Sequence, residues 1–134
     1  MTDLEKAETK KLVASRLSQL GETEEEIAKT LRQGNYQGLP GCAGDCPVRN
    51  YLADKLKEDE NNGLLHRRGL YTSVRTGACF THLYTNEEKY VTIANPLPVS
   101  QFVKAFDRKE YPDLIYRMAP PVPLKENKND YSIS

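Results

Sequence analysis

The feature that most constrains the fold of this chain is a glycine-rich loop that runs directly into a helix, at residues 38–56 (GLPGCAGDCPVRNYLADKL). Pro47 suits the first position of a helix, because the N–H that proline lacks is one that a helix start leaves unbonded. We therefore expect a shaped loop and then a helix from Pro47, with Asp45 or Cys46 as its N-cap. The residues that exclude regular structure before this helix are Gly34, Gly38, Pro40, Gly41 and Gly44.

Three further helices are expected from apolar spacing and capping patterns. Residues 4–20 place apolar side chains loosely on one face. Thr23 and Glu26 form a capping box, in which the hydroxyl accepts from the N–H of Glu26 and the Glu26 carboxylate reaches back to Thr23. Residues 99–109 carry the clearest amphipathic face of the chain. That face consists of Val99, Phe102, Val103 and Phe106.

The apolar period changes from helical to alternating after the third helix, which indicates strands. Residues 70–75, 78–84 and 89–94 are predicted to form a three-stranded antiparallel meander. The fold class is therefore α+β, with an N-terminal three-helix segment, the meander, and one further amphipathic helix packed on the sheet. Residues 1–124 are expected to form a single domain, a usual size for one core, and residues 125–134 a flexible polar tail.

Composition excludes some classes of partner. The 19 basic and 19 acidic side chains give no net charge, so no overall field attracts nucleic acid or anionic lipid. Three cysteines are an odd number, and no charged and then apolar leader is evident, which favours a reduced, cytoplasmic location. The apolar runs are far shorter than the roughly 20 residues of a membrane-spanning helix. We expect a soluble protein without a membrane partner.

Four potential zinc ligands occur in two pairs, Cys42 with Cys46 and Cys79 with His82. Three thiolates and one imidazole suit tetrahedral zinc. However, Cys79 and His82 are three residues apart in an expected strand, so their side chains would point to opposite faces. The three-residue gap between Cys42 and Cys46 also departs from the usual knuckle spacing. We therefore favour two loop cysteines and one core cysteine, and we expect no cofactor.

Cys46 could also be a nucleophile, because a helix N-terminus favours a thiolate. Asp45 opposes this, and the general base would have to be His66 or His82, neither of which has a recognisable pattern with Cys46. The favoured interpretation is a small capping residue. The same loop resembles a phosphate cradle, but no lysine and hydroxyl pair follows its glycines. A small-ligand site at the loop stays open as an alternative.

A basic and aromatic cluster follows the third helix, with His66, Arg67 and Arg68 beside Tyr71 and Arg75. Its cations could hold a phosphate, a nucleotide or an acidic partner surface. The simpler interpretation is a solvated segment that balances nearby acidic residues.

DNA binding is a further alternative. Residues 25–31 resemble the first helix of a helix-turn-helix, and residues 48–56 could be the second. About a dozen residues separate the two, whereas the motif joins its helices with three or four. The second helix would also expose Asp54 and Glu58 beside its cations, which weakens attraction to phosphate.

The chain contains four short motifs in a fixed order. They are EEIAxxL at 25–31, CPVxxYL at 46–52, LPVxxFVxxFD at 97–107 and YPxL at 111–114. The arrangement resembles a group of small uncharacterised bacterial and bacteriophage proteins that share a Cys-Pro-aliphatic helix start and a late aliphatic-Phe-Asp helix. The resemblance covers residues 23–116. It implies no catalytic residue, because that group has no established activity, and it implies a bacterial or phage accessory protein.

These patterns predict a small, non-enzymatic binding or regulatory accessory protein that engages a partner protein or a small anionic ligand. The alternatives are a DNA-binding regulator with a divergent helix-turn-helix and a small zinc-binding protein. Two histidines outside any motif offer little material for acid–base catalysis. The residues expected to contact the ligand or partner are Asp45, Cys46, Arg49, Asn50, Arg67, Arg68 and Arg75.

Overall fold

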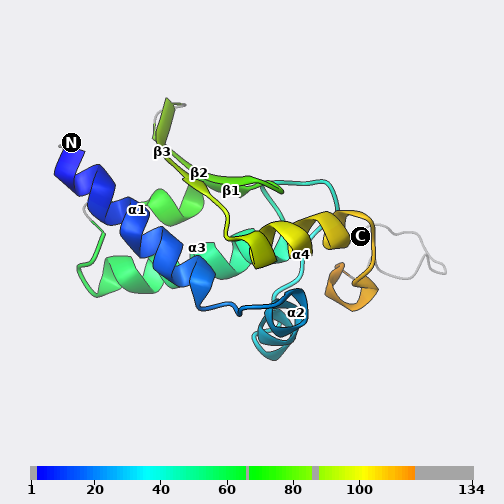
Figure 1. The fold of residues 1–134 in the computed structure, drawn as a ribbon. Helices are drawn as coiled ribbons and strands as arrows, with labels where there is room; N and C mark the ends of the chain where they lie inside the picture. Colours follow the sequence, from blue (N-terminus) through cyan, green and yellow to red (C-terminus); the bar gives the residue numbers. More distant parts are fainter. Residues whose placement is uncertain (1–2, 66, 86–87, 117–134) are drawn as a thin grey trace, which may run out of the picture.

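The structure is a computed structural model that describes residues 3–65, 67–85 and 88–116. Its described residues form four helices, two short 3₁₀ turns and one three-stranded sheet (Figure 1). This confirms the α+β class and the β1-β2-β3 antiparallel meander. The predicted polar tail at 125–134 lies outside the described residues. The elements are α1 (Asp3–Ser18), α2 (Glu24–Gln33), α3 (Pro47–Asn61), η1 (Leu70–Thr72), β1 (Val74–Thr76), β2 (Phe80–Thr85), β3 (Glu88–Ala94), α4 (Leu97–Asp107) and η2 (Pro112–Leu114).

The helix starts follow their local signals closely. Cys46 is the N-cap of α3 and Pro47 its first residue, as predicted. At α2, the N–H of Glu26 donates to the Thr23 hydroxyl at 3.1 Å, which confirms the first half of the capping box. The second predicted bond, from the Thr23 N–H to the Glu26 carboxylate, is wrong. The Glu26 carboxylate accepts instead from the N–H of the preceding residue, Glu22, at 2.8 Å.

The first predicted strand, 70–75, is wrong over its first half. Leu70–Thr72 is a 3₁₀ turn, which the Thr72 N–H closes onto the Gly69 carbonyl at 3.1 Å. Gly69 enters the turn with a φ of +78°, a left-handed conformation that glycine adopts without strain. Leu70 is buried in the core from this turn, so its apolar character reflected burial and not a strand.

Two helices cover one face of the sheet. α1 contacts β3 and α3 contacts β1, and the two helices also contact each other. The strand side chains that face them are buried: Val74, Thr76, Thr81, Leu83, Val91 and Ile93. α4 shares the same core, but its closest neighbour is α2 and not a strand. Figure 1 shows the sheet along one side of the helices, with none of the drawn helices on its other side.

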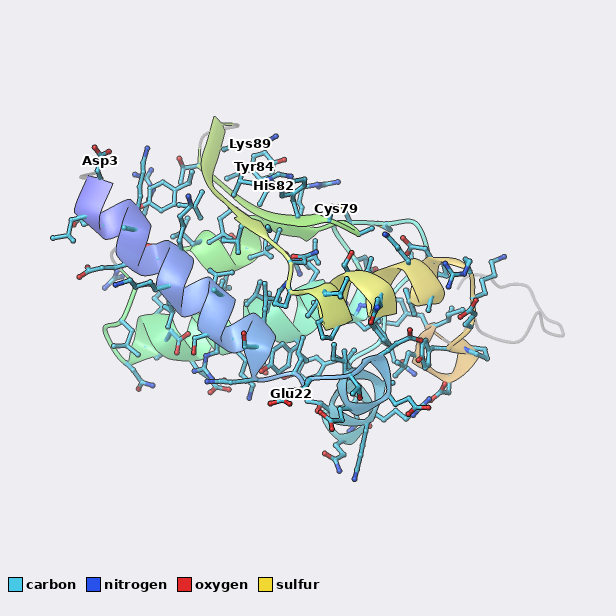
Figure 2. The ribbon with its side chains drawn as sticks, in the orientation of Figure 1. Asp3, Glu22, Cys79, His82, Tyr84 and Lys89 are labelled. Atoms are coloured by element: carbon cyan, nitrogen blue, oxygen red, sulfur yellow. The ribbon has the colours of Figure 1, made fainter. Side chains whose placement is uncertain are left out.

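The strand register decides which side chains occupy that open face. Arg75 of β1 lies opposite His82 of β2, and Tyr84 of β2 lies opposite Lys89 of β3. The pairing shifts between Leu83 and Tyr84, so that β3 contains one extra residue, Tyr90, which is buried. The irregularity thereby keeps Lys89 beside Tyr84. Figure 2 shows His82, Tyr84 and Lys89 on the side of the sheet away from the helices.

The helices of the described residues are all too short or too polar to cross a membrane.

Candidate functional site on the open sheet face

The glycine-rich loop before α3 has a fixed shape. Its ends meet at a hydrogen bond from the Leu39 N–H to the Asp45 carbonyl at 2.6 Å. A Cβ at position 38 would lie 2.5 Å from the same carbonyl oxygen, so only glycine fits at Gly38. The Thr76 N–H donates to the Ala43 carbonyl at 2.9 Å and attaches the loop to the end of β1. The loop therefore holds α3 and β1 in a defined relation.

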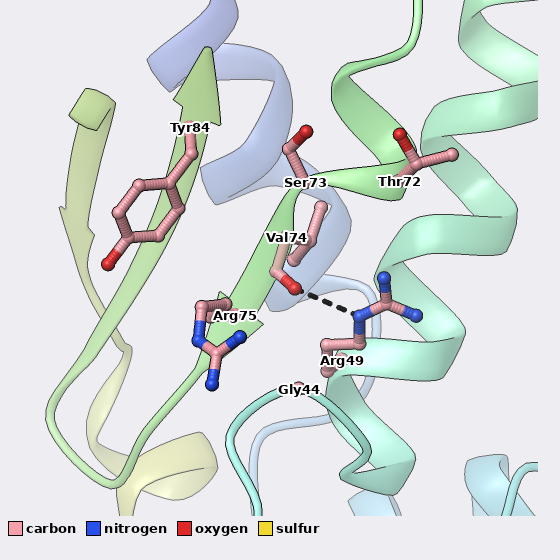
Figure 3. Close-up of a pocket in the computed structure, with 7 residues that line it drawn as sticks. All are labelled: Gly44, Arg49, Thr72, Ser73, Val74, Arg75 and Tyr84. Carbon is pink, nitrogen blue, oxygen red and sulfur yellow. Dashed lines mark hydrogen bonds between the residues drawn. The ribbon is translucent and has the colours of Figure 1, made fainter. Parts of the chain in front are cut away.

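A hollow with a volume of about 520 Å³ opens where the loop, α3 and β1 meet (Figure 3). Two arginines from different elements, Arg49 of α3 and Arg75 of β1, lie in its wall. None of the described residues that line it is acidic. The lining residues are Gly44, Arg49, Thr72, Ser73, Val74, Arg75 and Tyr84.

Arg49 is held in place within this hollow. Its Nε donates to the Val74 carbonyl at 2.9 Å (Figure 3). Its Nη1 donates to the Asn50 side chain at 3.2 Å. A guanidinium has five N–H donors, so these two bonds leave donors for another group. Arg49 is thus a fixed cation with unused hydrogen-bonding capacity.

Arg75 is more exposed and differently placed. It has no hydrogen bond or ion pair with the part of the chain that the structure describes. A Cβ at position 44 would lie 3.3 Å from Arg75 Nη1, so Gly44 leaves room for the guanidinium against the loop. The two arginines therefore approach one hollow from two sides, and no described residue of its lining carries an opposite charge.

A row of aromatic side chains continues from this hollow along β2. The Phe80 and His82 ring centres are 6.2 Å apart with nearly parallel planes, and those of His82 and Tyr84 are 6.1 Å apart. His82 Nδ1 lies 2.9 Å from the Thr92 hydroxyl oxygen of β3. Partial burial, and then the charge of Lys89, lower the pKa of His82. The lowered pKa favours the uncharged form of the His82 ring, so the row presents mainly uncharged rings at neutral pH.

A second hollow, of about 340 Å³, lies over this row and shares Arg75 and Tyr84 with the first. Within the described part of the chain, its lining also contains no acidic side chain. Its lining residues are Ala43, Arg75, Gly77, Cys79, Phe80, His82 and Tyr84. The candidate site is therefore one continuous surface, which we call the sheet-face site: the two hollows with their two arginines and three rings.

Only some of the residues predicted to contact a ligand or partner lie in the sheet-face site. Arg49 and Arg75 meet in the sheet-face site, whereas Asp45 and Asn50 belong to a neighbouring hydrogen-bond network. Asn50 Nδ2 donates to the Gln37 carbonyl at 2.7 Å and to Asp45 Oδ1 at 2.9 Å. The Tyr116 hydroxyl donates to the same oxygen at 2.9 Å. These polar groups fasten the loop to the chain after η2, and their contact with a ligand stays a prediction.

The other predicted contact residues lie elsewhere. The Cys46 thiol is only 2% exposed, and burial raises its pKa to about 11, so it is neither accessible nor ionised at neutral pH. Arg67 is half-buried and Arg68 exposed, and neither lines the sheet-face site. His66, the remaining histidine, lies outside the described residues.

The proposed zinc ligands do not form one site. Cys42, Cys46, Cys79 and His82 all fall within the described residues, which contain no cluster of three metal-ligating side chains. The argument that Cys79 and His82 point to opposite faces was nevertheless wrong. Cys79 precedes β2 and lines the same hollow as His82, so strand alternation does not apply to it. The core cysteine is Cys46, while Cys79 is exposed.

The arrangement of α2 and α3 gives little support to a helix-turn-helix. Residues 34–46 separate the two helices. Arg49 and Asn50, the first polar side chains of the would-be reading helix, form hydrogen bonds to β1 and the loop. Further along α3, Asp54 and Glu58 are exposed together with Lys57, so the outward surface carries mixed charge. The DNA-binding alternative stays a prediction.

Sequence reasoning missed the aromatic row. The available signal was the alternation of rings at Phe80, His82 and Tyr84, with Thr81 and Leu83 between them. That pattern predicts one aromatic face of a strand. Which face stays uncovered depends on where α1 and α3 lie, and the sequence pattern does not contain this information.

Comparison with family models, with curated proteins and with solved structures finds no match to this chain. The resemblance to small bacterial and phage proteins accordingly stays a prediction.

Proposed function

We propose that this protein is a non-enzymatic binding protein whose sheet-face site holds the anionic group of a ligand between Arg49 and Arg75. The observation that carries the proposal is that two guanidiniums line one hollow in which no described lining residue is a carboxylate. Guanidinium donors match the oxygens of phosphate and carboxylate in pairs, and these charge-assisted hydrogen bonds are stronger than neutral ones. In a chain with no net charge, such a local excess of positive charge favours an anion.

The hollow is also pre-organised, because hydrogen bonds within the protein already fix parts of its wall. Arg49 is fixed by its bond to Val74, and the closed loop fixes the wall that contains Gly44. The Ser73 side chain adds a hydroxyl to the lining. Groups that already have their bound geometry lose less conformational entropy on binding, which raises affinity. This supports a ligand site more than an incidental surface gap.

Catalysis is a weaker explanation of the same surface. Cys79 and His82 share the second hollow, but no hydrogen bond joins them, and His82 Nδ1 is engaged with Thr92. An activated nucleophile requires a base within hydrogen-bond reach. The buried thiol of Cys46 has a raised pKa and no access to the hollow. Binding is therefore the function that this geometry favours.

The test is an equilibrium titration with inorganic pyrophosphate as the probe, on the wild type and on Arg75→Gln. Arg75 has no partner in the described chain, so its loss should leave the unfolding midpoint unchanged. Loss of one charge-assisted contact should weaken binding about tenfold or more. Arg108→Gln is the matched control, because it removes an exposed arginine at the end of α4 that lines neither hollow. No saturable binding by the wild type, or equal affinity for all three proteins, would contradict the proposal.

A further inference from the structure

We propose that the ligand of the sheet-face site is a single-stranded nucleic acid, whose bases stack on Phe80, His82 and Tyr84 while its phosphates contact Arg49 and Arg75. This inference rests on the proposed function, since it uses the same two arginines for the anionic group. It adds the chemical class of the ligand and assigns a role to the three rings.

The first argument is the position of the rings. Phe80, His82 and Tyr84 alternate along β2, so all three extend from the face that α1 and α3 leave open. Phe80 is 49% exposed, although it is a large apolar side chain in the central strand of the sheet. The core does not require an aromatic ring there. Exposed aromatic rings on a sheet provide flat surfaces on which unpaired bases stack.

The second argument is the distribution of charge around the row. Arg75 lies directly across from His82 on one side, and Lys89 lies across from Tyr84 on the other. Arg49 adds a third cation in the first hollow. Among the described residues, neither hollow has an acidic side chain in its lining, so this surface is complementary to a chain of phosphates. A ligand that satisfies both features must combine planar rings with repeated negative charge.

Single strands and duplexes differ in whether the faces of their bases are accessible to the aromatic row. In a duplex the base faces are stacked on each other, so an aromatic row on a sheet cannot reach them. Recognition of a duplex would depend mainly on phosphate contacts. Three cations in a chain without net charge offer little of that attraction. In a single strand the bases are available, and each base that stacks on an aromatic side chain strengthens binding.

The experiment measures fluorescence anisotropy with labelled eight-residue strands: oligo(U), oligo(dT), an abasic DNA strand, and a duplex of matched length. The wild type should bind oligo(U) or oligo(dT) at least tenfold more tightly than the abasic strand, which has the phosphates without the bases. Either RNA or DNA satisfies the inference. With about three phosphates contacted, the logarithm of the affinity should fall with the logarithm of salt concentration at a slope of about −2.

Variants locate the effect. Phe80→Ala and Tyr84→Ala should each weaken binding of the strand by about 5-fold to 100-fold, which is the usual effect of losing one stacked base. They should leave binding of the abasic strand nearly unchanged. Leu97→Ala is the matched control, because Leu97 is an exposed apolar residue at the start of α4, outside both hollows. A thermal unfolding curve for each variant shows whether it is folded.

The outcomes distinguish this inference from the proposed function. Equal binding of abasic and normal strands, or tighter binding of the duplex, would overturn base stacking. Pyrophosphate binding that depends on Arg75, without binding of either single strand, would overturn this inference and leave the proposed function intact. Failure of pyrophosphate and of every strand to bind would overturn both.

Discussion

Arg16→Met is expected to destabilise the protein strongly, because it leaves a buried carboxylate without its cation. Arg16 of α1 donates to both oxygens of Asp59 on α3, from Nη2 at 2.6 Å and from Nε at 3.1 Å. The Asp59 side chain is only 1% exposed, whereas that of Arg16 is 21% exposed. Breaking a buried pair from one side costs about 3–5 kcal/mol. We expect about 3 kcal/mol, since the partly exposed position of Arg16 lets some water reach the carboxylate of the variant.

The assay is reversible unfolding in urea and by heat. For a chain of this length the unfolding entropy is about 0.3 kcal/mol/K, so the thermal midpoint should fall by about 10 °C. The matched control is Arg108→Met, which removes an arginine from a pair with Glu110 whose side chains are 62% and 51% exposed. Solvent screens that pair, and its loss should not change the midpoint measurably.

A double variant tests the cause of the loss. Arg16→Met combined with Asp59→Leu removes both charges and fills similar space with apolar groups, so it should recover part of the lost stability. An Arg16→Met protein with the wild-type midpoint would refute the reasoning. So would a double variant that is no more stable than Arg16→Met, since the loss would then not come from the unpaired carboxylate.

Two further predictions concern the loop and the thiols. Gly38→Ala should reduce the free energy of unfolding in urea by about 2 kcal/mol, because its new Cβ would lie 2.5 Å from a backbone oxygen. Gly77→Ala, whose nearest neighbour would be 3.8 Å away, should leave that free energy unchanged or raise it slightly, and equal effects of the two variants would contradict the close approach. With iodoacetamide at pH 8, mass spectrometry should show the exposed Cys79 alkylated well before Cys46, whose pKa is raised to about 11 by burial. Equal rates in the folded protein would show that Cys46 is not buried.

The parts of the fold that follow from local sequence were predictable. Thr23 with Glu26, and Cys46 with Pro47, mark their helix starts because capping depends on residues within one turn. Leu70 shows the limit of such signals. A buried leucine has the same apolar character in a strand as in a 3₁₀ turn, and only the tertiary contact of η1 with α3 distinguishes them.

Sequence reasoning singled out the two arginines of the candidate site, but it missed the aromatic row and could not predict how these residues assemble. Arg49 and Arg75 were both expected to contact a ligand, yet their meeting depends on the contact between α3 and β1, which lie far apart in the sequence. The cysteines illustrate the same limit. Burial of Cys46 and exposure of Cys79 result from how the loop and the sheet pack, and the spacing of cysteines does not encode it.

The most direct test of the central claim, that the sheet-face site binds an anion, is the location of the bound probe. Backbone amide NMR shifts can be followed during titration with pyrophosphate. We predict saturable shifts at Gly44 of the loop, at Ser73 just before β1 and at Arg75 of β1, all of which line the hollow, and none in α2. Shifts confined to other surfaces, or no saturable shift at these three amides, would contradict the account.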